Sequence, residues 1–200
     1  MVDEGVYNDP VYLDRFVAPH REVEHRTYKV CLYGEGAVGK TSLIRRYVDR
    51  TFSEKYIMTF GTNVSTKRKL TLQHPTEEDK AIEATLNIWD IMGQMGFSEL
   101  LKKKHFEGAA GAIGVADITR KETLDDLTYW TDSLYETVGK IPVIILANKC
   151  DVGKQQIKFT EREIADFAKK YKATYGFTSA KTGVNVGPAF RLLTEAIVRA

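Results

Sequence analysis

Apolar and polar positions alternate in blocks along the chain from about residue 27 onward. Short apolar runs typical of buried strands are followed by longer segments in which apolar residues recur with helical spacing. This order predicts an α/β fold with a mostly parallel sheet and helices on both faces, because parallel strands are joined by crossover helices. We expect strands at 28–33, 62–72, 81–90, 109–116, 142–148 and 174–177, and helices at 40–50, 97–106, 119–138, 160–171 and 186–199.

One pair of expected strands departs from the parallel pattern. The runs 62–72 and 81–90 are separated only by the polar segment 73–80, which is too short for a crossover. These two strands are therefore expected to be antiparallel. The sequence predicts a three-layer fold with a six-stranded sheet, in which one edge strand is antiparallel.

Two of the expected helices carry a capping-box pattern at their start. Thr119 is followed by Glu122, and Thr160 is followed by Glu163. In this arrangement the threonine hydroxyl accepts from an amide of the first turn, and the glutamate turns back to the capping residue. We therefore expect a helix to begin at each threonine.

The N-terminal segment differs from the rest of the chain. It contains prolines, mixed charge and scattered aromatic residues without helical or alternating order. We expect 1–27 to be an N-terminal extension, either a mobile tail or an arm docked through Tyr12, Leu13 and Phe16. We expect 28–200 to be one folded domain.

Composition limits the classes of function. With 43% hydrophobic and 28% charged residues, the chain can bury a substantial core. Its net charge of +2 is too small to favour nucleic acid or an acidic membrane as the main partner, so we expect no nucleic acid. Neither Cys31 nor Cys150 belongs to a metal-ligand motif, and we expect both to be reduced intracellular thiols.

The sequence carries no pattern for membrane insertion. No apolar run approaches the ~20 residues that a membrane span needs, and the N-terminus lacks a signal-peptide pattern. Val2 stands where myristoylation needs glycine, and the chain as given ends at Ala200 without a cysteine for prenylation. We expect a cytoplasmic protein without an integral membrane segment. Peripheral membrane association stays open, although the chain as given has no lipidation site.

A phosphate-binding motif directly follows the first expected strand. Residues 34–41 read GEGAVGKT and match GxxxxGK[ST] at every fixed position. Glycines let backbone N–H groups turn around a phosphate, and the positive end of the next helix points to the same place. Lys40 would reach the β- and γ-phosphates, and the Thr41 hydroxyl would bind Mg²⁺. The motif predicts a nucleoside triphosphate without indicating the base.

A second motif indicates guanine. Residues 148–151 read NKCD and follow an apolar strand. The Asp151 carboxylate can accept from N1–H and the exocyclic amino group of guanine. Adenine offers no such pair, and a buried acceptor without a partner costs roughly 1–3 kcal/mol. The Lys149 stem would lie along the base, and the Ala180 N–H, in a following TSAK segment, could bind guanine O6.

With these motifs the chain resembles the Ras superfamily of small GTPases, most closely its Rab-like branch. The resemblance covers about residues 28–200, and the segments 55–61 (KYIMTFG) and 90–94 (DIMGQ) resemble the two switches. It implies a P-loop NTPase fold, the Ras-like G domain, with Mg²⁺ as cofactor and GTP and GDP as substrate and product. The nucleotide-binding residues that it implies are Glu35, Gly36, Ala37, Val38, Gly39, Lys40, Thr41, Ser42, Phe52, Thr59, Asp90, Gly93, Asn148, Lys149, Asp151, Ser179, Ala180 and Lys181.

The resemblance also implies individual roles. Phe52 would pack edge-on against guanine, and Thr59 would bind both Mg²⁺ and the γ-phosphate. The Gly93 N–H would contact the γ-phosphate, and Gln94 would orient the attacking water. The expected catalytic residues are Lys40, Thr59 and Gln94, and the expected metal ligands are Thr41, Thr59 and Asp90.

Three residues depart from the second switch usual in the family, Asp-Thr-Ala-Gly-Gln-Glu. Ile91, Met92 and Met95 stand where the family usually has threonine, alanine and glutamate. The methionines either form a partner surface that depends on the nucleotide or pack against the sheet. They motivate an alternative function, a hydrolysis-deficient pseudo-GTPase that acts as a nucleotide-binding scaffold. A third alternative, an ATP-dependent kinase or ATPase, is disfavoured by Asp151.

The expected function is a molecular switch that hydrolyses GTP slowly. Arg45, Arg46 and Arg50 lie in or after the first helix, on a face that we expect to be solvated, so no arginine is plainly supplied in cis. An arginine from a partner accelerates such reactions roughly 10³–10⁵-fold. We therefore expect a monomer that needs an activating protein. Activator, exchange factor and effectors are expected to bind the switch regions 52–63 and 90–106.

Overall fold

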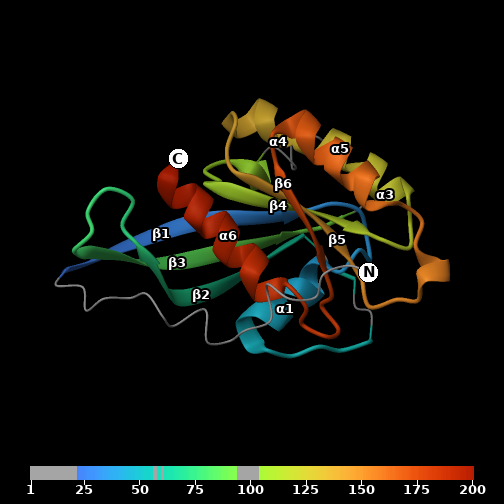
Figure 1. Ribbon diagram of the computed structural model, residues 1–200, viewed down its shortest axis with the longest axis horizontal. Coiled ribbons are helices and arrows are strands. Elements are labelled where there is room, and N and C mark those ends of the chain that lie inside the picture. Colours follow the sequence, from blue (N-terminus) through green and yellow to red (C-terminus); the bar gives the residue numbers. More distant parts are fainter. Residues whose placement is uncertain (1–21, 56–57, 60, 94–103) are drawn as a thin grey trace.

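One sheet organises the molecule. The computed structural model describes residues 22–55, 58–59, 61–93 and 104–200. Its 6-stranded sheet has the order β2-β3-β1-β4-β5-β6 (Figure 1). Neighbouring strands are parallel apart from β2 and β3, so the expected antiparallel edge strand is confirmed. The strands are β1 (Glu22–Tyr33), β2 (Thr62–Gln73), β3 (Lys80–Ile91), β4 (Gly111–Asp117), β5 (Val143–Asn148) and β6 (Thr174–Thr178).

Helices cover both faces of this sheet. Alternate residues of β1 point to opposite faces: Val30 and Leu32 pack with α1 and α6, whereas Cys31 and Tyr33 pack with α4 and α5. Figure 1 shows the same two layers, with α1 and α6 on one side and α3, α4 and α5 on the other. The three-layer α/β fold is therefore confirmed. The helices are α1 (Lys40–Asp49), α3 (Glu122–Asp125), α4 (Leu127–Val138), α5 (Glu161–Tyr171) and α6 (Val186–Arg199), with a short 3₁₀ helix at Lys154–Gln156.

The first strand begins earlier than expected, at Glu22 instead of residue 28. Its additional residues pair in parallel register with the start of β3, from Glu22 opposite Lys80 onward. Most of them are exposed, so backbone hydrogen bonds rather than burial hold them, and the apolar pattern gave no signal. The division at 27/28 stays a prediction, since residues 1–21 and the contacts expected from Tyr12, Leu13 and Phe16 lie outside the described residues.

The two capping boxes have different outcomes. At Thr160 the box is confirmed: the Thr160 hydroxyl accepts from Glu163 N, and Thr160 N donates to Glu163 Oε2 at 2.7 Å. At Thr119 the prediction is wrong. Both N and Oγ1 of Thr119 donate to the carboxylate of Asp117, at 3.0 and 2.7 Å. A carboxylate two residues upstream is a stronger acceptor than a hydroxyl, and α3 begins only at Glu122.

The remaining expectations concern the helix at 97–106, the two cysteines and membrane-spanning segments. The helix expected at 97–106 lies mostly outside the described residues. Both cysteines are free thiols, Cys31 buried and Cys150 half-buried. Within the described ranges, no helix is both long enough and apolar enough to cross a membrane.

Candidate nucleotide-binding site

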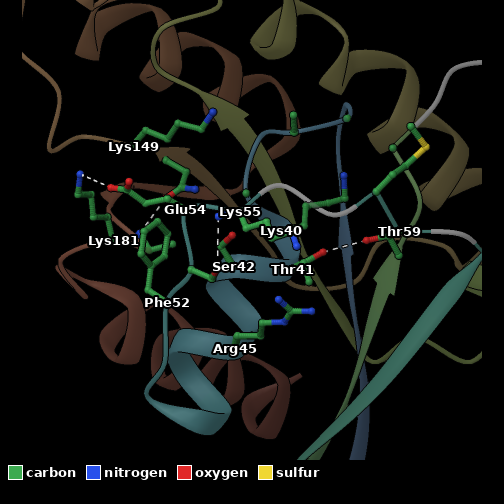
Figure 2. A pocket seen from close by; sticks show the side chains of 18 of the residues that line it. Lys40, Thr41, Ser42, Arg45, Phe52, Glu54, Lys55, Thr59, Lys149 and Lys181 are labelled. Carbon is green, nitrogen blue, oxygen red and sulfur yellow. Dashed lines mark hydrogen bonds and ion pairs between the residues drawn. The ribbon is translucent and has the colours of Figure 1, made fainter.

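The largest concentration of expected site residues lines one pocket at the carboxyl ends of the parallel strands. The cavity has a volume of about 360 Å³ and lies over the start of α1 (Figure 2). Ligands in open α/β sheets bind at this edge, beside the point where the strand order reverses. The expected residues that line it are Gly36, Ala37, Gly39, Lys40, Thr41, Ser42, Phe52, Thr59, Gly93, Asn148, Lys149, Asp151, Ala180 and Lys181.

The phosphate loop joins β1 to α1 in the expected strand–loop–helix order. Gly39 has φ 102°, a left-handed conformation that favours glycine, and a Cβ there would collide with the side-chain amide of Asn148. Ala37 also has a positive φ of 60°. The surrounding structure therefore holds Ala37 in a left-handed conformation that alanine rarely adopts.

Lys40 is buried inside this loop, with 6% of its surface exposed. Its Nζ donates to the carbonyl oxygens of Gly34 and Glu35, both at 2.8 Å. Burial lowers the pKa of Lys40 to about 8, although the charges of Asp90 and Glu35 oppose this shift. The ammonium group is thus desolvated and held at the loop, where a phosphate would supply the missing negative charge.

Three oxygen ligands expected for a metal ion converge beside Lys40. Thr41 Oγ1 donates to Asp90 Oδ2 at 2.5 Å and lies 3.0 Å from Thr59 Oγ1, which is itself 3.5 Å from Asp90 Oδ2. Asp90 is 2% exposed, and its buried Oδ1 has no hydrogen-bond partner among the described residues. Burial raises the pKa of Asp90. A hard divalent cation with oxygen ligands, directly or through water, would satisfy this carboxylate, so the residues fit Mg²⁺.

The second switch meets the phosphate loop at Gly93. A Cβ on Gly93 would lie 2.5 Å from both the Glu35 backbone and Lys40 Nζ, so no other residue fits here. Met92, only 7% exposed, is part of the pocket wall, and its N–H donates to the Gly61 carbonyl at 3.2 Å. Of the two interpretations given for the methionines, a partner surface or internal packing, the buried position of Met92 agrees with internal packing. Gln94 and Met95 lie outside the described residues.

Asn148 connects the base motif to the phosphate loop. Its Nδ2 donates to the Val38 carbonyl at 2.9 Å, and its Oδ1 accepts from Ala180 N at 3.2 Å and Thr178 Oγ1 at 3.3 Å. All of these bonds are buried. The Ala180 amide expected to bind guanine O6 therefore already has an acceptor, which the base would share or replace.

The other base-motif residues are held by neighbours. Ser179 Oγ donates to Asp151 Oδ1 at 2.5 Å, which orients the carboxylate. Lys149 has φ 68°, and its Nζ donates to Asp117 Oδ2 at 2.6 Å. With the ammonium fixed at Asp117, the aliphatic stem of Lys149 is free to line the pocket. Sequence reasoning did not identify this role of Asp117.

Arg46 is a second residue that sequence reasoning missed. We expected a solvated face, but Arg46 Nε donates to the Ala180 carbonyl at 2.8 Å and Nη2 donates to the Lys181 carbonyl at 2.5 Å. Its guanidinium also lies 5.9 Å from the centre of the Phe52 ring. Arg46 thus fixes the base loop to α1. The neighbouring Arg45 is exposed and lines the pocket.

An ion pair spans the mouth of the pocket beside Phe52. Lys181 Nζ lies 2.8 Å from Glu54 Oε1, with both side chains mostly exposed (Figure 2). Glu54 belongs to the first switch region and Lys181 to the base loop. The pair therefore connects the segment expected to change with the nucleotide to the segment expected to bind the base.

Comparisons with known proteins agree with this geometry. The Ras family model matches residues 29–199. The Ras-related protein Rab-32 of Homo sapiens is 34% identical, over 90% of this chain and 79% of that protein. The Ras-related protein Rab-22A of Mus musculus is 36% identical, over 86% and 84%. The GTP-binding nuclear protein GSP1 of Encephalitozoon cuniculi (strain GB-M1) is 34% identical, over 82% and 73%.

These matches span nearly the whole described domain and confirm the resemblance found in the motifs. Ras-like GTPases bind GTP and GDP, generally with Mg²⁺, and interact with regulators and effectors. Nothing in the comparisons favours a pseudo-GTPase. The chain belongs to the Ras superfamily as a Rab-like small GTPase, a GTP-binding molecular switch that hydrolyses GTP.

Proposed function

We propose that the pocket over α1 binds GDP and GTP with Mg²⁺, and that this protein hydrolyses GTP slowly until an activating protein binds. The observation that carries the proposal is the convergence of Thr41, Thr59 and Asp90 beside Lys40, where the buried Asp90 Oδ1 has no partner in the part of the chain that the structure describes. A divalent cation and a polyphosphate would neutralise these buried charges.

The phosphate side of the site works by placing positive charge. The Lys40 ammonium would leave the carbonyls of Gly34 and Glu35 for the β- and γ-phosphates, which are stronger acceptors. Backbone amides of residues 35–42 and the positive end of α1 would surround the β-phosphate. When bound, Mg²⁺ would neutralise charge on the β- and γ-oxygens. Thr41 and Asp90 would hold it in both nucleotide states, and Thr59 only with GTP.

The base side of the site works by selective hydrogen bonding. Ser179 donates to one oxygen of Asp151 and orients the carboxylate, and both oxygens keep a lone pair that can accept from guanine. Lys149, Phe52 and Lys181 line the pocket, where the Lys149 stem would lie along the base and Phe52 would pack edge-on against it. Adenine would leave the Asp151 carboxylate without its donors, and this supports guanine as the base.

Hydrolysis requires a correctly placed water. Gln94 is our candidate for orienting it, by its position after Gly93 and not by any described contact. Among the described residues, Arg45 lines the pocket but is exposed. We assign it no role in stabilising the transition state of hydrolysis. We therefore attribute the missing positive charge to a partner, which would accelerate hydrolysis roughly 10³–10⁵-fold.

The switch regions are the proposed surface for partners. With GTP, Thr59 and the Gly93 N–H would bind the γ-phosphate and order the segments 52–63 and 90–106, and after hydrolysis these contacts would be lost. Activator, exchange factor and effector would distinguish the two states there. We further propose a cytoplasmic monomer that associates with membranes at most peripherally.

The test combines nucleotide content with single-turnover hydrolysis. Purified protein should retain guanine nucleotide and release it when EDTA removes Mg²⁺. GTP preloaded on the wild type should turn over slowly, and Gln94→Ala should be slower still. Equal rates for wild type and Gln94→Ala would remove the role of Gln94, whereas no hydrolysis in either would favour the scaffold alternative. Tighter binding of ATP than of GTP would refute the role of Asp151.

A further inference from the structure

A buried carboxylate lies between the two halves of the nucleotide site. In the sheet β4 lies between β1, which leads to the phosphate loop, and β5, which leads to the base motif. Asp117 is the last residue of β4 and pairs in register with Asn148 of β5. It is 1% exposed. A charged side chain so deeply buried must have partners that compensate its desolvation.

Among the described residues, the hydrogen-bond partners of the Asp117 carboxylate are donors that belong to the site or lie next to it. Its Oδ1 accepts from the N–H and hydroxyl of Thr119, at 3.0 and 2.7 Å. Its Oδ2 accepts from Lys149 Nζ at 2.6 Å and Arg120 Nε at 3.2 Å. Burial alone would raise the pKa of Asp117, but the hydrogen bonds from Lys149 and Thr119 outweigh it and lower the pKa. The carboxylate is therefore ionised and bound by two cations.

Arg120 continues this connection to the phosphate loop. While Nε donates to Asp117, Nη2 of the same guanidinium donates to the Gly36 carbonyl at 2.8 Å. The guanidinium is planar, so these two bonds fix its orientation. A continuous path of hydrogen bonds thus runs from the base motif at Lys149, through Asp117 and Arg120, to the phosphate loop at Gly36.

The bond to Gly36 affects a phosphate ligand directly. The Gly36 carbonyl and the Ala37 N–H belong to one planar trans peptide, in which they point in opposite directions. Arg120 holds the carbonyl on one side of this peptide and so holds the Ala37 N–H on the other side, which is the side that a phosphate would occupy in this proposal. Ala37 has a φ of 60°, so this orientation is not the one that an alanine prefers. An outside restraint is needed to keep it.

From this geometry we infer that Asp117 and Arg120 are positioning residues that couple guanine binding at Lys149 to phosphate binding at Gly36, and so slow the release of GDP. The inference rests on the proposed nucleotide site. Fixing the Lys149 ammonium keeps its stem in place against the base, and fixing Gly36 keeps the loop amides ready for the phosphate. Each half of the site would then be ordered in part by the other.

The experiment measures the dissociation rate of a fluorescent GDP analogue from the full chain with Mg²⁺. Arg120→Ala should accelerate release about tenfold, the effect of one lost hydrogen bond to a charged group. Arg120→Lys, which keeps a single donor, should recover part of this loss. Asp117→Asn should accelerate release more than Arg120→Ala, about thirtyfold, because both cations lose their charged acceptor.

The matched control is Lys121→Ala, which removes the neighbouring positive charge. Lys121 pairs with Asp125 and Glu163, away from the phosphate loop, so GDP release should not change. If Asp117→Asn does not fold, Arg120→Ala carries the test, since that side chain is 34% exposed.

A double-mutant cycle separates coupling from a merely structural role. Lys149→Met keeps an apolar stem but loses the ammonium group. If the path couples both halves, Lys149→Met with Arg120→Ala should release GDP at least about fivefold more slowly than the product of the single effects predicts. The coupling would be overturned by strictly multiplicative effects, or by an Arg120→Ala release rate equal to that of the wild type. In either case, slow GDP release from the wild type would still support the nucleotide site. A wild type that releases GDP as fast as Asp151→Ala would overturn both.

Discussion

The two ends of the central strands carry similar charged side chains in different surroundings. At the nucleotide end, Lys40, Asp90 and Asp117 are buried, and the two carboxylates accept from Thr41 and Lys149, which lie 49 and 32 positions away in the sequence. At the opposite end, where β1, β2 and β3 extend beyond the helices (Figure 1), Lys80 contacts Glu22 and Glu77 at 3.4 and 2.8 Å with side chains that remain partly exposed.

The difference lies in desolvation. An exposed ion pair exchanges water for a partner with little net gain, whereas a buried charge without its partner is strongly destabilised. Buried groups at the nucleotide end therefore respond to the arrival of a phosphate, a cation or a base, and exposed groups at the other end do not. One exception is His74, which is buried at the hairpin between Glu24 and Glu77, at 3.5 and 3.6 Å.

The largest effect should follow from filling the contact between the second switch and the phosphate loop. Gly93→Ala places a Cβ against the Glu35 backbone and Lys40 Nζ, so the Gly93 N–H must move away from the γ-phosphate position. Losing one preorganised donor costs about 10²–10³-fold in rate. Single-turnover GTP hydrolysis by preloaded protein measures this.

The control for this substitution is Gly187→Ala. Gly187 lies within α6, and a Cβ there meets no atom within 4 Å. Alanine should leave hydrolysis unchanged and stabilise the helix by about 0.5–1 kcal/mol. A Gly93→Ala protein that hydrolyses GTP at the wild-type rate would show that the two loops separate before the reaction.

The next effect concerns pH and Lys40. Its pKa of about 8 in the free protein means that the ammonium loses its proton above this pH unless a phosphate stabilises it. Affinity for GDP should therefore be constant below about pH 8 and fall roughly tenfold per unit above it. Titrations between pH 7 and 9.5 measure this, and Lys40→Met should bind weakly with a flatter profile. The same slope in Lys40→Met would assign the titration to another group.

Stability of the nucleotide-free protein should change in the opposite direction. The folded pKa of Lys40, about 8, lies below the ordinary value of 10.5, so the unfolded chain binds more protons between these two values. Stability from this group therefore rises as pH increases through that window. Thermal unfolding of EDTA-treated wild type and Lys40→Met across the window would test the sign.

Sequence patterns predicted the parts of the fold and site in which the interacting residues are also close together in the sequence. Lys40 and Thr41 follow one local pattern, and the apolar pattern located the strands β4 and β5 and the helix α6 to within about two residues. Thr119 and Thr160 show the limit, because their capping patterns are identical and only the acceptor at Asp117 distinguishes them. That signal was present locally, as a carboxylate two residues before a threonine.

Other contacts had no local signal. Arg46 lies more than a hundred positions before the carbonyls that it binds, and its helix position alone indicated an exposed face. Early β1 has no apolar alternation, because its residues are mostly exposed and pair with β3 through backbone hydrogen bonds and exposed ion pairs. Long-range polar contacts and exposed strand ends therefore require the fold before they can be found.

A smaller effect should follow from Arg46→Ala, which frees the base loop from α1. The carbonyls of Ala180 and Lys181 lose a charged donor, so the loop around guanine becomes less ordered. GDP release should accelerate about five- to tenfold. Arg162→Ala is the control, because Arg162 is 91% exposed and lies 3.8 Å from Asp166 on the same helix. If both variants behave alike, the Arg46 contacts do not stabilise the bound state.

The smallest effect should come from Lys80→Ala at the opposite end of the sheet. This change removes both contacts with Glu22 and Glu77 but leaves the backbone pairing of β1 with β3 intact. The melting temperature should shift by less than about 2 °C, and GDP release should stay at the wild-type rate. Raising the salt concentration should remove even this shift, because exposed pairs are screened. A change in GDP release as large as that of Arg46→Ala would show instead that the long strands transmit strain to the site, and that burial alone does not separate the two ends.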